Sequence, residues 1–255
     1  MITPILAGYY EPDVHGRKAP ESLCGSVKMW AHLSRQNITV AKCTVERLMK
    51  ANGWEGVRRV KRVRTTRRPG SRPGAGPGPA AVPGAGAVPA ARRGLHLCPD
   101  ATGCFAYTAF VIDAYANRIV GWECSTSKET AFVESAIRQA TALPAREGQP
   151  LNKVIQHSYA GSQYTSVHFG ETLFLNSMLP SIGTAGDAFD NVLAETTIGL
   201  YKHECVRADS PFRRGPLDRL SDLEMITADW VHWYNSSRLM HHLGRIAPVE
   251  AEANY

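Results

Sequence analysis

Two blocks in the second half of the chain carry the residues best suited to chemistry. The first reads HSYAGSQYTS from His157 to Ser166, and the second reads GDAFDNVLAET from Gly186 to Thr196. There are 35 residues between Tyr159 in the first block and Glu195 in the second. Carboxylate oxygens are ligands that Mg²⁺ prefers. Glu195 is therefore a candidate metal ligand, although a lone glutamate on a helix is usually a solvated surface residue.

The layout of these blocks resembles the catalytic core of insertion-sequence transposases of the retroviral-integrase-like, Asp-Asp-Glu class. In that family three carboxylates hold two Mg²⁺ ions, which activate the attacking hydroxyl or water and stabilise the leaving oxygen. The resemblance makes Glu195, preceded by Asp190-Asn191 and followed by GLYKHE, the third carboxylate. The second would be the aspartate of an HSD block, but Tyr159 stands there, and a phenol with a pKa of about 10 is a poor Mg²⁺ ligand. We therefore expect no productive binding of the two ions.

The first carboxylate of the family should lie on a strand before Phe105, 19 residues ahead of Asp113, and that count reaches Gly94. The family would show a string like DFTYVP here, whereas residues 94–99 read GLHLCP. A shift of one base relates the two strings: GGA CTT CAC CTA TGT CCC G encodes GLHLCP, and a start one base later encodes DFTYVP. Asp100 lies too close to the following hairpin to replace the lost ligand.

We interpret residues from about Pro69 to Asp100 as a reading-frame error, with the frame restored before Phe105. Of the 22 residues from Pro69 to Ala90, six are Pro, six Gly and six Ala, a composition with little to bury. We expect residues 68–94 to be a disordered linker. The alternative is a genuine flexible linker, with residues 94–99 as a divergent strand.

Residues 1–67 are expected to form a helical DNA-binding region with a basic tail. The apolar residues from Ser26 to Asn52 follow a helical period that is interrupted near Asn37, and Thr39 could cap the second helix. Two short helices with a tight turn are typical of a helix-turn-helix, although a plain helical hairpin fits the pattern equally. The segment also resembles the helix-turn-helix of the same transposase family. The expected DNA-binding residues are Lys42, Thr44, Arg47 and Lys50 on the second helix and Arg58, Arg59, Lys61 and Arg62 in the tail.

Residues 95–255 are expected to form the integrase-like core. Residues 105–122 predict an antiparallel hairpin, residues 129–142 a helix, residues 153–157 a strand and residues 220–234 an amphipathic helix. This order predicts an α/β fold with a ribonuclease H-like mixed sheet flanked by helices. The resemblance gives Asp113 a structural role, makes Trp230, Trp233 and Tyr234 core residues, and places Arg238 and His241 near DNA.

Composition favours a polyanionic partner and an intracellular location. The net charge is +6, and seven cations fall within the 11 residues from Arg58 to Arg68, a density that can track phosphates or form a solvated tail. The six cysteines form no CxxC pair, so neither a zinc site nor a disulfide framework is indicated. No signal peptide or long apolar run is present, so we expect a soluble cytoplasmic protein.

Three functional hypotheses follow. The leading one is a transposase that binds the ends of an insertion element and joins them to target DNA, in a copy that has lost two of three catalytic carboxylates. Its implied partners are double-stranded DNA, further copies of the chain and a protein from the element's first reading frame. The second hypothesis is a non-enzymatic helix-turn-helix protein that occupies element ends, and the third is a product that folds poorly.

Overall fold

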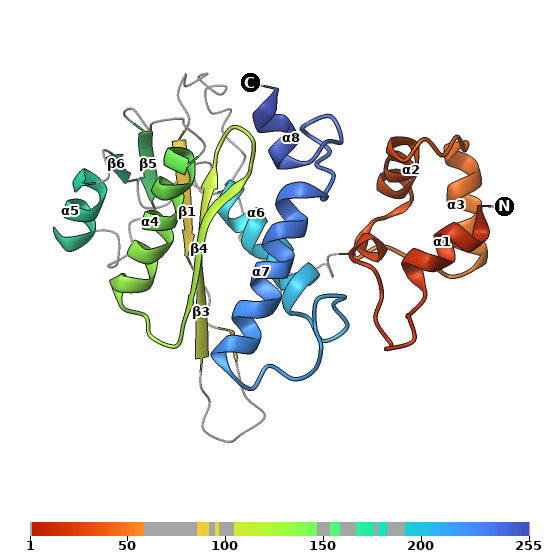
Figure 1. Ribbon diagram of the computed structural model, residues 1–255, viewed down its shortest axis with the longest axis horizontal. Coiled ribbons are helices and arrows are strands. Elements are labelled where there is room, and N and C mark those ends of the chain that lie inside the picture. The colour runs from red at the N-terminus through yellow and green to blue at the C-terminus, as the bar shows by residue number, and fades with distance from the viewer. Residues whose placement is uncertain are drawn as a thin grey trace, which may run out of the picture.

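In the computed structural model, the described residues are 2–58, 86–91, 95–96, 105–146, 154–158, 167–175, 178–182 and 192–254. They form a small N-terminal helical module beside a layered α/β core (Figure 1). No helix within these ranges is long and apolar enough to cross a membrane.

The N-terminal module consists of helices α1 (Thr3–Tyr10), α2 (Ser26–Arg35) and α3 (Lys42–Ala51), with a 3₁₀ turn η1 (Pro20–Leu23). Its core is apolar and contributed by all three helices: Leu6, Tyr10, Cys24, Met29, Leu33, Val45 and Met49 are buried. The chain returns past α2 at Gly56, where a Cβ atom would lie 2.4 Å from the backbone nitrogen of Gly25. The expected helix-turn-helix is therefore present, with its two helices packed by their apolar faces.

The start of α3 differs from the expectation. Thr39 does not cap it, because the helix begins at Lys42 after Ala41, and no side chain caps it. The Trp30 indole donates a hydrogen bond of 2.9 Å to the carbonyl of Val40. This bond holds the segment before Ala41 outside the helix, and Asn37 makes the turn with a φ of 60°.

The sheet of the core has strands β1 (Gly86–Ala91), β2 (Leu95–His96), β3 (Phe105–Asp113), β4 (Ile119–Ser125), β5 (Val154–Ser158) and β6 (Met178–Ile182). Strand β3 pairs antiparallel with β4 on one side and with β1 on the other. Strands β1, β5 and β6 then run parallel, and β2 pairs with the start of β3. This mixed sheet is the one expected, including the 105–122 hairpin.

Strand β1 corrects one prediction. Residues 86–91 lie in the stretch expected to be disordered, yet they form the strand between β3 and β5. Pro89 lacks an N–H and is unusual inside a sheet. Without β1, however, β3 and β5 would each leave a row of backbone groups unpaired, and such pairing outweighs local composition.

Helices cover both faces of the sheet (Figure 1). Helix α4 (Thr130–Arg146) packs on the face that presents Ala109 and Val111, and α5 (Val167–Leu175) adds Leu173 to the same core. Gly121 of β4 permits the close approach, because a Cβ there would lie 2.0 Å from the carbonyl oxygen of Ala136.

The opposite face of the sheet, which presents Phe110 and Ile112, packs on α6 (Val192–Tyr201) and α7 (Leu220–Ser236). A π-helical turn η2 (Lys202–Val206) follows α6, and α8 (Pro248–Ala253) ends the described chain. Trp230, Trp233 and Tyr234 of α7 are at most 7% exposed, as expected for core residues.

Candidate functional site

Glu195 lies in the first turn of α6, which packs against β1. Its neighbours Ala194 and Thr197 are each 1% exposed and face the core, while Glu195 is exposed. No described residue forms a hydrogen bond or ion pair with its carboxylate. The sheet therefore lies beside the helix of Glu195, as a ribonuclease H-like site requires, and the carboxylate is open to solvent.

Strand β1 lacks an oxygen ligand. It occupies the centre of the sheet beside α6, and its sequence is GAVPAA, without a carboxylate. The two other expected positions, Gly94 and Tyr159, lie outside the described residues, with β5 ending at Ser158 directly before Tyr159. Within the described ranges no three His, Cys, Asp or Glu residues gather closely enough to hold a metal ion. Of the three positions that the resemblance assigns to metal ligands, the described residues therefore include Glu195.

Asp113 has a structural role in the described turn, as the sequence indicated. Its carboxylate accepts a hydrogen bond of 2.6 Å from the backbone N–H of Ala116, and its own N–H donates to the carbonyl of Arg118 at 2.8 Å. These bonds close the turn between β3 and β4, where Asn117 has a φ of 58°. Asp113 is thus a turn residue of the hairpin.

Helix α3 presents a basic face to solvent. Lys42, Arg47 and Lys50 are exposed and Thr44 is half-buried, while Val45 and Met49 on the other face are buried. Lys42 lies 3.5 Å from Glu46 in an exposed pair, which leaves the charges of Arg47 and Lys50 uncancelled within the described residues. Arg58 is also exposed, whereas Arg59, Lys61 and Arg62 lie outside the described residues. Three of the four helix residues expected to contact DNA are therefore exposed on α3, and the fourth, Thr44, is half-buried.

Arg238 corrects another expectation. It was placed near DNA, but it is 7% exposed, and its guanidinium makes a forked pair with Glu204 of η2, with Nη2 2.7 Å from Oε1 and Nε 2.9 Å from Oε2. The indole of Trp230 donates to the same carboxylate at 3.3 Å. Burial alone would lower the pKa of Arg238, but Glu204 outweighs it and the pKa is raised. Arg238 is thus a buried structural cation, while His241 is exposed.

A buried hydroxyl network fixes α6 to the sheet and to α7. Tyr201 lies at the end of α6, and its hydroxyl is 2.6 Å from Oγ1 of Thr227, which itself donates to the carbonyl of Leu223. Oγ1 of Thr108 on β3 lies 3.5 Å from the same phenol. Burial raises the pKa of Tyr201 well above its usual value, so the phenol stays protonated and donates to Thr227.

Sequence reasoning assigned no role to Glu204, Tyr201 or Thr227. Glu204 stands inside GLYKHECV between the polar Lys202-His203 and the apolar Cys205-Val206, so its neighbours do not mark it as a buried acidic residue. Such a residue needs a buried partner. Nothing local identified Arg238 as that partner, because it lies 34 positions further along the chain.

Comparison with known proteins supports both parts of the molecule. An HTH-like domain model matches residues 17–62. A Mycobacterium tuberculosis (strain H37Ra) protein assigned to insertion element IS986/IS6110 as its transposase is 42% identical over 91% of this chain and 82% of its own length. The transposase for insertion sequence element IS629 of Shigella sonnei is 39% identical over 91% of this chain and 74% of its own length.

The fold also matches a solved structure. A chain of the simian T-cell lymphotropic virus intasome superposes with a TM-score of 0.53 at 11% identity, covering 91% of this chain and 74% of that one. This likeness supports the fold, and the two sequence relatives support the family. The chain belongs to the insertion-sequence transposases, with an N-terminal helix-turn-helix and a ribonuclease H-like core of the retroviral-integrase type.

Proposed function

We propose that this chain binds the ends of its insertion element through α2 and α3 and that its core does not cut or join DNA. The observation that carries the second half of the proposal is the composition of β1. The strand beside α6 has the sequence GAVPAA, so the central strand next to the helix of Glu195 supplies no carboxylate.

The charge and shape of α3 support DNA binding. In a helix-turn-helix the second helix enters the major groove, and side chains on its exposed face reach bases and phosphates. Lys42, Arg47 and Lys50 lie on that face of α3, and the basic run from Arg58 to Arg68 follows the module. Lysine and arginine contacts to phosphates make binding strongly dependent on salt.

The metal chemistry of the family argues against catalysis by this copy. Two Mg²⁺ ions in that family supply the nucleophile and stabilise the leaving oxygen. Glu195 is one carboxylate of the three that the resemblance calls for, and Tyr159 offers a neutral phenol at the second position. One carboxylate brings too little charge and too few oxygens to hold two dications beside a phosphodiester.

The reading-frame error accounts for the missing first ligand. Under this proposal, residues from about Pro69 to Asp100 are out of frame, and a shift of one base turns GLHLCP into DFTYVP. The restored aspartate would stand at position 94, ahead of β3, which begins at Phe105. Double-stranded DNA and further copies of the chain remain its expected partners.

Two assays on the full chain test the proposed function. A gel shift with duplexes carrying the element's terminal repeats should show binding, and the exchange of Arg47 and Lys50 for glutamine should weaken it. A strand-transfer assay with the same duplexes in Mg²⁺ or Mn²⁺ should show no joined product. Joining that disappears on Glu195→Gln would refute the loss of catalysis, and absence of any binding by the unaltered chain would refute the assignment of α3.

A further inference from the structure

The loop between η2 and α7 holds a pair of adjacent arginines, Arg213 and Arg214, which no part of the proposed function uses. The loop is rigidly anchored. Ser210 donates from Oγ to the carbonyl of Glu204 at 2.7 Å and accepts from the N–H of Phe212 at 3.1 Å. Phe212 is 6% exposed and packs on Trp233 with ring centroids 5.7 Å apart. The two arginines that follow Phe212 therefore start from a fixed backbone.

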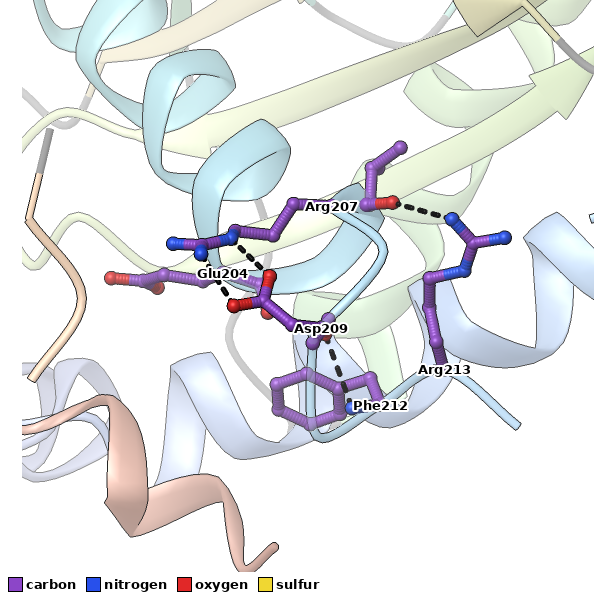
Figure 2. A network of polar contacts seen from close by, with 7 residues as sticks. Glu204, Arg207, Asp209, Phe212 and Arg213 are labelled. Carbon is purple, nitrogen blue, oxygen red and sulfur yellow. Dashed lines mark hydrogen bonds and ion pairs between the residues drawn. The ribbon is translucent and has the colours of Figure 1, made fainter. Parts of the chain in front are cut away.

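The Arg213 guanidinium is held in place by backbone carbonyls. Nε and Nη2 donate to the carbonyl of Gly215 at 3.2 and 3.0 Å, and Nη1 donates to the carbonyl of Val206 at 3.3 Å. Figure 2 shows the Arg213 side chain with its guanidinium extended toward the chain near Arg207. Carbonyl oxygens orient a guanidinium without cancelling its charge, and two of its five N–H groups stay available.

Arg207, in the same loop, provides the contrast. Both Nε and Nη2 of Arg207 donate to the carboxylate of Asp209, a forked pair whose side chains are 39% and 67% exposed (Figure 2). Arg213 has no carboxylate partner within the described residues. The positive charge of this loop that has no carboxylate partner among the described residues therefore lies at Arg213, in the second half of the loop.

Arg214 adds a second, more accessible cation. Its Nη2 lies 3.1 Å from Oδ2 of Asp229, and the two side chains are 58% and 46% exposed. A pair this exposed is weak and readily exchanged for another anion. Arginine is the side chain best suited to phosphate, because its planar fork matches the phosphate oxygens.

The position of the loop relative to the N-terminal module favours DNA as the anion. Pro211 lines a hollow of about 560 Å³ together with residues 7, 8, 11–13 and 17–19 of the module. The loop thus lies beside α1 and the segment that follows it, on the side of the core next to the N-terminal module (Figure 1). A duplex held by α3 carries one negative charge for roughly every 1.7 Å of its axis, so backbone phosphates continue beyond the contact with α3.

From these observations we infer that Arg213 and Arg214 form a second DNA contact, on the core, that binds backbone phosphates without reading sequence. This inference rests on the proposed DNA binding and adds a site to it. Phosphate contacts position a protein on the duplex, while base contacts specify sequence. Loss of the two charges should therefore weaken binding to every duplex equally.

Fluorescence anisotropy with the full chain tests this site, using one duplex with the terminal repeat and one of unrelated sequence. The variant Arg213→Gln/Arg214→Gln should lower the slope of log affinity against log salt by about 2, and Arg214→Gln alone by about 1, on both duplexes. Arg138→Gln is the matched control, because Arg138 is an exposed arginine on α4, which covers the opposite face of the sheet. The salt slope of this variant should equal that of the unaltered chain. Circular dichroism of each variant checks that the loop change leaves the fold intact, and Arg214→Gln remains a test if the double variant fails to fold.

Unchanged slopes for Arg214→Gln and for a folded double variant would overturn the inference while leaving the DNA binding of α3 in place. A loss confined to the terminal-repeat duplex would also overturn it, because that result indicates base readout. If the unaltered chain binds neither duplex, the proposed function fails, and this site fails with it.

Discussion

The pair of Glu204 and Arg238 gives the sharpest prediction for stability. Both side chains are 8% exposed, and the carboxylate receives the fork of Arg238 and the indole of Trp230. Glu204→Gln would leave a buried guanidinium without a counter-charge, which costs roughly 3–5 kcal/mol. At roughly 2–4 °C for each kcal/mol, we expect Tm to fall by about 6–20 °C.

Urea unfolding followed by tryptophan fluorescence measures this cost, because Trp230 contacts the pair directly. Asp229→Asn is the matched control, since it removes one partner of the exposed Arg214 pair and should change stability by less than about 1 kcal/mol. Glu204→Gln/Arg238→Met should recover much of the loss, because no charge is then buried alone. A cost for Glu204→Gln no larger than that of the control would refute the buried pair as described.

Three further predictions concern DNA binding, thiol ionisation and the gene. Arg47→Gln/Lys50→Gln should lower the salt slope of binding to terminal-repeat DNA by about 2, as measured by anisotropy, and an unchanged slope would exclude α3 from the interface. Burial raises the pKa of the Cys124 thiol from 9.0 to about 11, so the folded state keeps a proton that the unfolded chain releases, and stability should fall as pH rises from 9 to 11. Cys124→Ala should remove about 2–3 kcal/mol of that alkaline loss in urea titrations at pH 8 and pH 11, and an equal loss in both proteins would contradict the assignment. Nucleotide sequencing of codons 64–105 should reveal two compensating frame shifts that restore an aspartate, and a reading without such shifts would exclude the frame error.

Periodicity predicted most of the core because the elements there are long and regular. The apolar run of β3 corresponds to a strand that the structure buries on both faces, and the helical spacing in α4 and α7 corresponds to the face that each helix buries. Boundaries were less predictable. The residue type of Thr39 predicts a helix cap. In the structure the Trp30 indole donates a hydrogen bond to the Val40 carbonyl, and α3 begins later, at Lys42.

Contacts between residues distant in sequence could not be predicted from local composition. Residues 86–91 have the composition of a linker. They form a strand because their backbone pairs with both β3 and β5, whose hydrogen-bonding groups would otherwise be unpaired. In the same way, the sequence near Arg238 does not indicate that its guanidinium pairs with Glu204 in the folded chain. Glu195 was identified by its flanking residues, and its role as a metal ligand stays a prediction.

The most direct test of the central claim is a titration of the full chain with Mn²⁺, followed by electron paramagnetic resonance of the free ion. The claim is that the acidic set of the family core is broken and that Glu195 alone does not hold a divalent ion. We predict that the chain and its Glu195→Gln variant leave the same concentration of free Mn²⁺ at every point of the titration. Saturable binding of Mn²⁺ that Glu195→Gln abolishes would contradict the claim.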